Sequence, residues 1–506
     1  MQHRTQDTSY VSTRGGMEPA GFLDVLLSGL APDGGLAVPT EVPHLTASTL
    51  ESWRSLSYPE LAAEVIGLYA TDIPATDLQA LTAAAYGPGH FPPPVVPLRP
   101  AGAVAPGLAL VGLSEGPTMA FKDLAMQFLG QAIPYTLSRE GRVLNILGAT
   151  SGDTGSAAEH AFRGRDGVSV FMLSPQGRMS DVQRAQMYSL ADPNIHNIAV
   201  EGVFDDCQNL VKAINNDPDF KTEHSIGAVN SINFGRIAAQ VVYYVWAWLR
   251  ASDHLRIAAP GESEAARTHG GADAPHHETG VEAACFSIDV AVPSGNFGNI
   301  YAGHLVRTMG VPIRRLILAT NENNVLDEFF STGVYRPRSS GQTLATSSPS
   351  MDISKASNLE RFIWTLLGPE EFQSRWPELE RTGVLDLSDR LVRMRKDFGF
   401  ISGTSTHADR ITAIRRVHEA TGAPIDPHTA DGVAVALRAM EPGFPTLVLE
   451  TARPEKFPET VAEALGAPQA VPPTIHRLLN AEQHVVNIPC DESRLRALIA
   501  TDALRP

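Results

Sequence analysis

The sequence predicts an α/β protein in which two domains with parallel sheets follow a mainly helical N-terminal domain. From about residue 99 onward, short runs of apolar and β-branched residues alternate with helical segments, a pattern typical of parallel strands covered by helices on both faces. The chain also has 506 residues, more than one hydrophobic core usually serves, so two or three domains are expected.

The first 98 residues lack this alternation. Their pattern is helical, with turns such as "APDGG" and "YGPG", and it ends in the proline cluster "FPPPVVPLRP". Clusters of proline interrupt regular structure and are typical of domain boundaries. We therefore assign residues 1–98 to the N-terminal domain.

Strands and helices alternate through most of the remaining chain. The predicted strands are residues 108–113, 142–150, 168–175, 195–200, 286–292 and 314–320. The predicted helices are residues 155–162, 180–190, 205–216 and 299–310, and the apolar run "VVYYVWAWL" at 241–249 predicts a further, buried helix.

Residues 251–284 break the alternation. They are rich in Gly, Ala, Glu and His and have no periodicity, which predicts a flexible surface insertion. His269, His276 and His277 could ligate a metal, but the composition favours an unstructured histidine patch, so we predict no metal site.

Charge and cysteine content exclude several classes of function. The formal net charge of -16 argues against nucleic acid or an anionic membrane as the main partner, although one cationic pocket could still bind a small anion. Cys207, Cys285 and Cys490 match no disulfide or metal pattern. The N-terminus has no secretory apolar run, and no segment offers the ~18 apolar residues of a membrane span. We expect a cytoplasmic monomer or homodimer.

Lys122 stands out in the stretch "GPTMAFKDLAMQF". The chain has only six lysines, and this one begins a predicted helix whose following residues are mostly apolar. A desolvated lysine can lose its proton and act as a nucleophile, whereas an arginine stays charged. An ion pair with Asp123 or a distant carboxylate is the alternative explanation.

Two glycine-rich turns connect predicted strands to helices, "GATSGDTGSAAEHAF" at 148–162 and "VAVPSGNFGNIYAGHL" at 290–305. Small residues before a helix expose backbone N–H groups that suit a phosphate or carboxylate. Neither turn matches a Walker loop or the dinucleotide fingerprint. A simple helix cap by Asp153 or Ser294 is the alternative for each turn.

These motifs, in this order, resemble the threonine synthase family of pyridoxal-phosphate enzymes, which have fold type II, the fold of the tryptophan synthase β superfamily. The other matching stretches are "YVSTRG", "APDGGLAVP", "NSINFGRIAAQ", "TNENN", "SPSMDISKASNLERF", "GTSTHADR", "IDPHTADG" and "ETARPEKFPE". In this fold the chain leaves one α/β unit and returns to it. The resemblance thus implies a large domain at 99–143 plus 285–506 and a small domain at 144–250.

The resemblance implies which residues bind the cofactor. Lys122 corresponds to the lysine that binds pyridoxal phosphate covalently, Asp153 to the residue facing its phenolic oxygen, and Thr451 to the hydroxyl opposite its pyridine nitrogen. A threonine hydroxyl is a weak acid, so it would leave that nitrogen largely unprotonated. The cofactor-phosphate loop corresponds to Gly295, Asn296, Phe297, Gly298 and Asn299.

It also implies a substrate site. Thr150, Ser151 and Thr154 would bind the amino acid's carboxylate, and Asn230, Ser231 and Arg236 the leaving phosphate, for which an arginine fork is well suited. For Arg236 a surface ion pair is the alternative.

Two further motifs leave their roles open. The stretch that contains Ser350, Asp352, Ser354 and Lys355 could contact substrate or only shape a lid. For the histidines of "GTSTHADR" and "IDPHTADG", His407 and His428, we favour a structural role over acid–base catalysis, because "DPHTA" is typical of a capped helix start.

The resemblance implies an enzyme, a carbon–oxygen lyase that converts O-phospho-L-homoserine and water into L-threonine and phosphate, the last step of threonine biosynthesis. It would eliminate the γ-phosphate and then add water at Cβ. A lyase or dehydratase acting on phosphate-free serine or threonine is one alternative. A catalytically silent relative and a phosphate-binding α/β protein without pyridoxal phosphate are two others.

Overall fold

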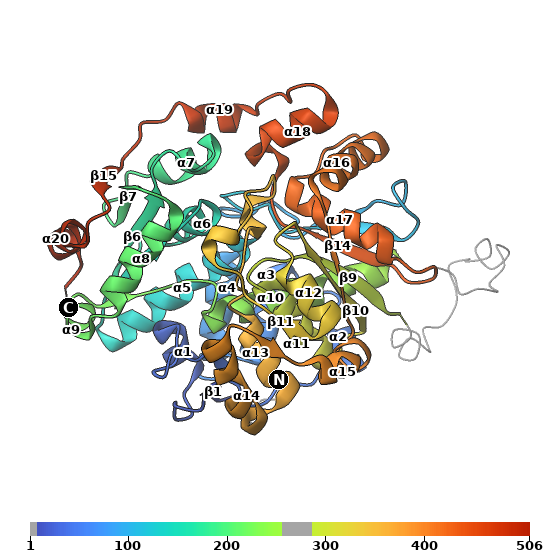
Figure 1. Cartoon of the computed structure of the whole chain (residues 1–506), viewed down its shortest axis with the longest axis horizontal. Helices are drawn as coiled ribbons and strands as arrows, with labels where there is room; N and C mark the ends of the chain where they lie inside the picture. Colours follow the sequence, from blue (N-terminus) through green and yellow to red (C-terminus); the bar gives the residue numbers. More distant parts are fainter. Residues whose placement is uncertain (1–7, 256–285, 506) are drawn as a thin grey trace.

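A computed structural model of the chain describes residues 8–255 and 286–505. It contains two parallel sheets, which lie side by side in Figure 1. The predicted insertion at 251–284 falls almost entirely outside the described residues, as do its three histidines and Cys285.

The larger sheet has the strand order β13-β10-β9-β14-β4-β3. Its strands are β3 (Leu98–Pro100), β4 (Leu108–Gly112), β9 (Ile288–Pro293), β10 (Ile313–Thr320), β13 (Phe400–Thr404) and β14 (Thr446–Glu450). All neighbours are parallel except β3, which is antiparallel to β4 and lies at the edge. The residues of β4, β9 and β14 are all buried, as expected of strands covered on both faces.

The smaller sheet is entirely parallel and has the order β15-β7-β6-β5-β8. Its strands are β5 (Leu144–Ala149), β6 (Val168–Pro175), β7 (Ile195–Glu201), β8 (Ile226–Gly227) and β15 (Val486–Pro489). The orange-to-red C-terminal segment runs over the top of Figure 1 and delivers β15 to this sheet. The end of the predicted range 285–506 therefore lies with the smaller sheet.

The predicted α/β class and the helical N-terminal region are confirmed. Besides the strands β1 (Tyr10–Ser12) and β2 (Ala37–Pro39), the described N-terminal residues form α1 (Phe22–Ser28), α2 (Ala47–Ser52), α3 (Tyr58–Gly67) and α4 (Ala75–Ala85). All six predicted strands and four predicted helices are present. The apolar run at 241–249 lies in the buried helix α10 (Phe234–His254), which contacts α3, α5 and α11.

The remaining helices connect and cover the sheets. They are α5 (Lys122–Glu140), α6 (Asp153–Phe162), α7 (Asp181–Tyr188), α8 (Phe204–Asn215), α9 (Pro218–Glu223), α11 (Gly298–Thr308), α12 (Val325–Thr332), α13 (Leu359–Leu367), α14 (Pro369–Thr382), α15 (Leu391–Lys396), α16 (His407–Thr421), α17 (Pro427–Ala439), α18 (Pro458–Leu465), α19 (Pro473–Leu479) and α20 (Glu492–Asp502). Short 3-10 turns include η4 (Pro349–Met351) and η6 (Pro454–Lys456), and a small pair of strands is β11 (Val334–Tyr335) with β12 (Leu385–Asp386).

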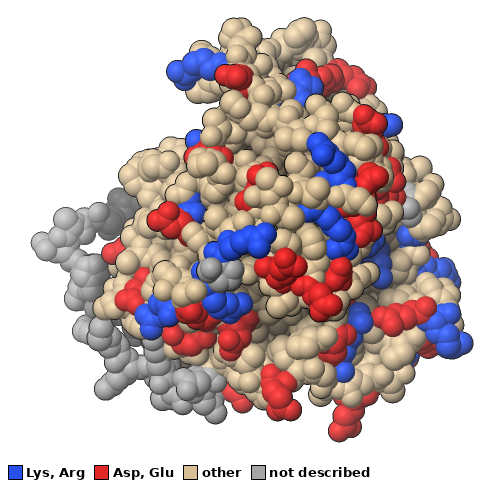
Figure 2. Space-filling model, turned by 90° about the vertical axis from the view of Figure 1, so that its left-hand side faces the viewer, with Lys and Arg blue, Asp and Glu red and all other residues tan. Residues whose placement is uncertain are grey.

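The segments that follow β5, β9 and β14 carry the motifs singled out in the sequence. In open α/β sheets, ligands bind beyond the carboxyl ends of the strands, which is where these segments begin. On the face shown in Figure 2, basic and acidic side chains are interspersed. In the described part of the chain, no helix combines the length and apolar character needed to cross a bilayer.

Candidate active site

Hydrogen bonds hold the loop before Lys122 at two points. Asp123 is buried, and it accepts hydrogen bonds from the backbone N–H and the hydroxyl of Thr118 at 2.8 and 2.6 Å. The N–H of Phe121 donates to the carbonyl of Thr451 at 2.9 Å, so this loop pairs with the segment that follows β14. These bonds place Lys122 at the first position of α5, beside the end of the larger sheet.

Burial raises the pKa of Asp123 to about 6, although its hydrogen bonds to Thr118 lower it. Because this value lies above that of the unfolded chain, folding takes up a proton between the two values, and stability falls as the pH rises through this range. The Asp123→Asn variant should lose this dependence, which amounts to up to about 3 kcal/mol. Urea unfolding of both proteins from pH 4 to 7 measures it, and parallel curves would contradict the assignment.

Lys122 lies close to one carboxylate and two cations. Its Nζ is 3.5 Å from Oδ2 of Asp153, and its side chain is 14% exposed. Burial lowers the pKa of Lys122, and the charges of Lys456 and Arg236 lower it further, whereas Asp153 raises it. Asp123 is not the partner of Lys122, since that carboxylate binds Thr118, but the other predicted alternative, an ion pair with a distant carboxylate, is found with Asp153. Because its pKa is lowered, this amine loses its proton more readily than a free lysine does, which suits a nucleophile.

Asp153 is the first residue of α6, and its carboxylate makes contacts on both oxygens. Oδ1 accepts from Nζ of Lys456 at 2.6 Å and from Nε2 of Gln183 at 2.9 Å, while Oδ2 accepts from the hydroxyl of Ser350 at 2.9 Å and faces Lys122. Burial would raise the pKa of Asp153, but the two lysines lower it well below its usual value. The carboxylate is thus an ionised group of the site and not a helix cap.

Lys456, which contacts Asp153, is a residue of this site that the sequence interpretation missed. Two signals could have found it, since it is one of only six lysines and lies in the matching stretch "ETARPEKFPE". Its side chain is fully buried in η6, and its Nζ also donates to the carbonyl of Thr118 at 2.9 Å.

The turn after β9 has a constrained backbone and is closely packed. Phe297 has a positive φ of 66°, and its ring packs on Phe330 and Phe400 at centroid distances of 5.7 and 5.8 Å. A Cβ at Gly295 would lie 2.9 Å from Cγ1 of Ile353. The turn leads directly into α11, whose first backbone N–H groups are suited to a phosphate.

The amide of Asn299 also fits a ligand in this turn. Its Oδ1 accepts from the hydroxyls of Tyr243 and Tyr244 at 2.6 and 3.0 Å, and its Nδ2 is buried without a hydrogen-bond partner. Asn296 uses its backbone carbonyl to accept from Asn358 at 3.1 Å. An unpaired buried donor at the start of α11 is what a cofactor phosphate would satisfy.

Arg236, on α10, is buried and makes few polar contacts with the described residues. It is 3% exposed, its Nε has no hydrogen-bond partner within residues 8–255 and 286–505, and Nη1 donates a long hydrogen bond of 3.4 Å to the carbonyl of Val229. Burial lowers its pKa to about 10. No carboxylate among the described residues pairs with Arg236, so the predicted alternative of a surface ion pair is not found. A buried guanidinium without a counter-ion fits a phosphate ligand.

The other predicted substrate residues differ in how free their side chains are. The hydroxyl of Thr150 accepts from the N–H groups of Gly152 and Gly155 at 3.0 and 2.9 Å, so it shapes the turn. Ser151 is exposed and Thr154 half-buried. Asn230 is exposed, and its Oδ1 accepts from the N–H of Ile232 at 3.2 Å, while Ser231 is half-buried. Thr451 is buried directly after β14.

The stretch at 343–355 is mostly held by its own contacts. Asp352 accepts from the amides of Asn321 and Asn323 at 2.8 and 2.9 Å, and the hydroxyls of Thr343 and Ser354 lie 2.6 Å apart. The side chain of Lys355 is exposed. Asp352 and Ser354 therefore shape this loop, and Ser350 is the member of the predicted group that touches Asp153.

His407 and His428, for which we favoured a structural role, both make structural contacts. Nδ1 of His428 lies 2.8 Å from Asp426, which caps α17, and its Nε2 accepts from the N–H of Ser350 at 3.1 Å. The predicted capped helix start is confirmed. His407 lies between Ser347 and Glu463 at 2.8 and 2.9 Å. In the described part of the chain, neither ring makes a hydrogen bond or ion pair with Lys122.

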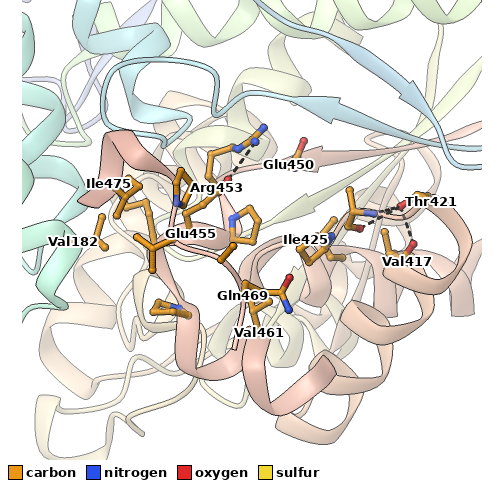
Figure 3. Close-up of a pocket in the computed structure, with 18 of the residues that line it drawn as sticks. Val182, Val417, Thr421, Ile425, Glu450, Arg453, Glu455, Val461, Gln469 and Ile475 are labelled. Atoms are coloured by element: carbon orange, nitrogen blue, oxygen red, sulfur yellow. Dashed lines mark hydrogen bonds and ion pairs between the residues drawn. The ribbon is translucent and has the colours of Figure 1, made fainter. Parts of the chain in front are cut away.

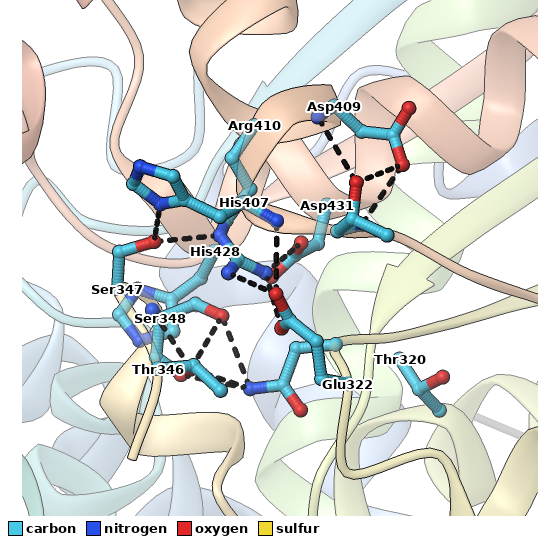
Figure 4. Close-up of polar contacts among 12 residues, drawn as sticks. Thr320, Glu322, Thr346, Ser347, Ser348, His407, Asp409, Arg410, His428 and Asp431 are labelled. Carbon is cyan, nitrogen blue, oxygen red and sulfur yellow. Dashed lines mark hydrogen bonds and ion pairs between the residues drawn. The ribbon is translucent and has the colours of Figure 1, made fainter. Parts of the chain in front are cut away.

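The buried Arg410 connects three of the matching stretches, "TNENN", "GTSTHADR" and "IDPHTADG" (Figure 4). Arg410 is fully buried and contacts Asp431 at 3.0 Å, Glu322 at 2.9 Å and Ser347 at 2.8 Å. The Arg410→Met variant leaves the buried carboxylate of Asp431 without its cation and should lower the free energy of unfolding by about 3–5 kcal/mol. Denaturant unfolding measures this, and the double variant with Asp431→Leu should be less destabilised than the single one. Equal losses would contradict the pairing.

A cavity of about 800 Å³ lies beside this site (Figure 3). Its lining includes Val417, Glu450 and Arg453, together with α19. None of the residues predicted for the cofactor lines this cavity, although Lys456 does.

Comparison with known proteins gives the family. A model of the threonine synthase N terminus matches residues 9–86, and a model of the threonine synthase C-terminal region matches residues 429–499. A threonine synthase from Corynebacterium glutamicum is 48% identical, covering 97% of this chain and 98% of that protein. The chain belongs to the threonine synthase family. The threonine synthase of Methylobacillus glycogenes is 46% identical, covering 97% of this chain and 99% of the relative.

The threonine synthase fold is confirmed by a solved structure. The crystal structure of pyridoxal-phosphate-bound threonine synthase from Brucella melitensis superposes with a TM-score of 0.87 at 37% identity, covering 98% of this chain and 99% of that one. The predictions of fold type II, of pyridoxal phosphate as cofactor and of threonine synthase as enzyme are thereby confirmed. The roles of individual residues remain predictions.

Proposed function

We propose that this chain forms L-threonine and phosphate from O-phospho-L-homoserine and water with Lys122 and Arg236 as its central residues. The observation that carries this proposal is the buried guanidinium of Arg236, which has no counter-ion among the described residues and whose charge lowers the pKa of the Lys122 amine. A site with a nucleophilic amine and a nearby cation without a counter-ion suits an amino acid that carries a phosphate.

The residues present fit pyridoxal phosphate. We assign its aldehyde to Lys122, its phosphate to the turn from Gly295 to Asn299, its phenolic oxygen to Asp153 and its pyridine nitrogen to Thr451. The unpaired Nδ2 of Asn299 supports the phosphate assignment. When bound, the cofactor delocalises the negative charge that develops on substrate carbon atoms.

The chain's own groups would bind the substrate and move its protons. Ser151 and Thr154, in the turn shaped by Thr150, would bind the α-carboxylate at the start of α6. The Nζ of Lys122 would take the proton from Cα, pass it on, and then take the proton from Cβ. Arg236, with Asn230 and Ser231, would bind the phosphate as the Cγ–O bond breaks. Water then adds its oxygen at Cβ, Cγ and Cα each regain a proton by way of Lys122, and the remaining proton of water leaves with the phosphate.

The main rival is a lyase that acts on phosphate-free serine or threonine, which has no need of Arg236. Purified enzyme should release threonine and phosphate in equal amounts from O-phospho-L-homoserine. Serine and threonine should give little or no keto acid. Keto acid as the main product, without threonine from the phosphorylated substrate, would contradict the proposal in favour of this rival.

We further propose that the enzyme is cytoplasmic, a monomer or homodimer, and independent of nucleic acid and membranes. The net charge of -16 and the sparse cysteines support this. The sheet order supports the proposed domain ranges with one change, which is to move residues 486–505 into the small domain. Light scattering of the purified protein measures the oligomeric state.

A further inference from the structure

Lys456 is a buried ammonium beside the reacting lysine. Its side chain is 0% exposed, and its Nζ lies 2.6 Å from Oδ1 of Asp153 and 2.9 Å from the carbonyl of Thr118. A buried charge is costly unless it is paired and hydrogen-bonded, and this one is both. Threonine formation as proposed above gives Lys456 no direct task, so its position needs a separate explanation.

The two lysines share one carboxylate unequally. Lys456 contacts Oδ1 of Asp153 at hydrogen-bond distance, whereas Lys122 faces Oδ2 at the longer distance of 3.5 Å and is 14% exposed. A single negative charge cannot neutralise two buried ammonium groups. The shorter contact and the second acceptor make Lys456 the principal ion-pair partner of Asp153.

We propose that Lys456 is a positioning residue that holds Asp153 ionised and in place and, by its own positive charge, keeps the amine of Lys122 neutral. This inference rests on the proposed role of Lys122 as the cofactor-binding lysine. It assigns the two lysines different tasks, since Lys122 reacts while Lys456 supplies a permanent charge.

The other charged groups around the pair agree with this division. Arg236 adds a second positive charge near Lys122, and burial lowers the pKa of Lys122 in the same direction. Asp123 and His160 also interact with Lys456, and burial holds the pKa of His160 at about 4, so this ring is neutral at pH 7. The charged and titratable groups facing the two lysines are Asp153, Arg236, Asp123 and His160.

The backbone explains why the two lysines stay together. The N–H of Phe121 donates to Thr451, and the N–H of Arg453 donates to Met119 at 3.1 Å, which joins the loop before Lys122 to the segment before Lys456. Met119 has a positive φ of 58°, so this pairing holds the loop in an uncommon conformation.

The test measures how fast the protein rebinds its cofactor as a function of pH. Holoenzyme is stripped of pyridoxal phosphate with hydroxylamine, and the return of the visible absorption band on adding pyridoxal phosphate is followed from pH 6 to 10. The Lys456→Met variant should shift the midpoint of this profile upward by about one pH unit or more, because Asp153 then pairs with Lys122 alone. Lys456→Arg, which keeps the charge, should stay near wild type.

A second pair of variants keeps the proposal testable if the single variant Lys456→Met does not fold. Asp153→Asn removes the carboxylate, so the midpoint should be lower in this variant than in the double variant that also carries Lys456→Met, again by about one unit. The exposed Lys396→Met is the matched control and should not move the midpoint. The proposal would be overturned if Lys456→Met had the same midpoint as the wild type and the double variant had the same midpoint as Asp153→Asn.

The assay uses no substrate, so its result does not depend on whether the product is threonine. In Lys122→Ala the band of the covalently bound cofactor should not return at any pH. If it returned as in wild type, the proposed cofactor site itself would be wrong, and the inference about Lys456 would fail with it.

Discussion

Replacing Lys122 by alanine is expected to reduce threonine formation by at least about three orders of magnitude, because this variant loses both the proposed attachment point of the cofactor and the proton carrier. The fold should be retained, since the loop before Lys122 is held by Asp123 and by the pairing with Thr451, and neither contact uses the lysine side chain. Release of threonine and phosphate, measured together with the melting temperature, separates these two effects.

Lys396→Ala is the matched control for this experiment, because Lys396 is exposed at the end of α15. Its activity and melting temperature should equal those of the wild type. Substantial threonine formation by a folded Lys122→Ala variant would show that another group carries the chemistry.

Replacing Arg236 by methionine should lower activity without lowering stability. Loss of charge-assisted bonds to the substrate phosphate, about 1.5–3 kcal/mol, should lower kcat/KM for O-phospho-L-homoserine about 10- to 150-fold. The free energy of unfolding should stay constant or rise, because an unpaired buried charge is removed. Steady-state kinetics and denaturant unfolding test the two parts separately.

Arg361 is the contrasting control for stability. It is also fully buried, but it donates hydrogen bonds to the carbonyls of Ala37 and Ile232 at 2.9 and 2.6 Å, so Arg361→Met should destabilise the protein. If Arg236→Met were destabilised to the same extent, with kcat/KM unchanged, Arg236 would have a structural role and the proposed phosphate site would be wrong.

The strands were predictable because their pattern is local. Buried parallel strands such as β6 and β9 are continuous apolar runs, and their boundaries match the sequence interpretation to within about two residues. The strands β13 and β14 were not predicted. β15 was not predicted, because "VNIP" is short and mostly exposed, with little apolar pattern. Its place beside β7 depends on a long connection through α18 and α19.

The candidate site was predictable where a motif carries its own chemistry. Lys122 and the two glycine-rich turns could be singled out because a lysine before apolar residues, or glycines before a helix, are visible in neighbouring residues. Thr150 was assigned to substrate, although its hydroxyl is used within its own turn. The unpaired state of Arg236 could not be seen in the sequence, because it depends on what distant segments fail to supply.

The sequence by itself determined the α/β class and the family and singled out Lys122 as the proposed reactive lysine, since each of these rests on short motifs whose residues are neighbours in the chain. Only the tertiary structure decided that Lys456 and Ser350 meet on the carboxylate of Asp153, opposite and beside Lys122. The physical reason is that the order of strands in the two sheets, and not distance along the chain, sets which loops adjoin. A buried charge network is completed only by that adjacency.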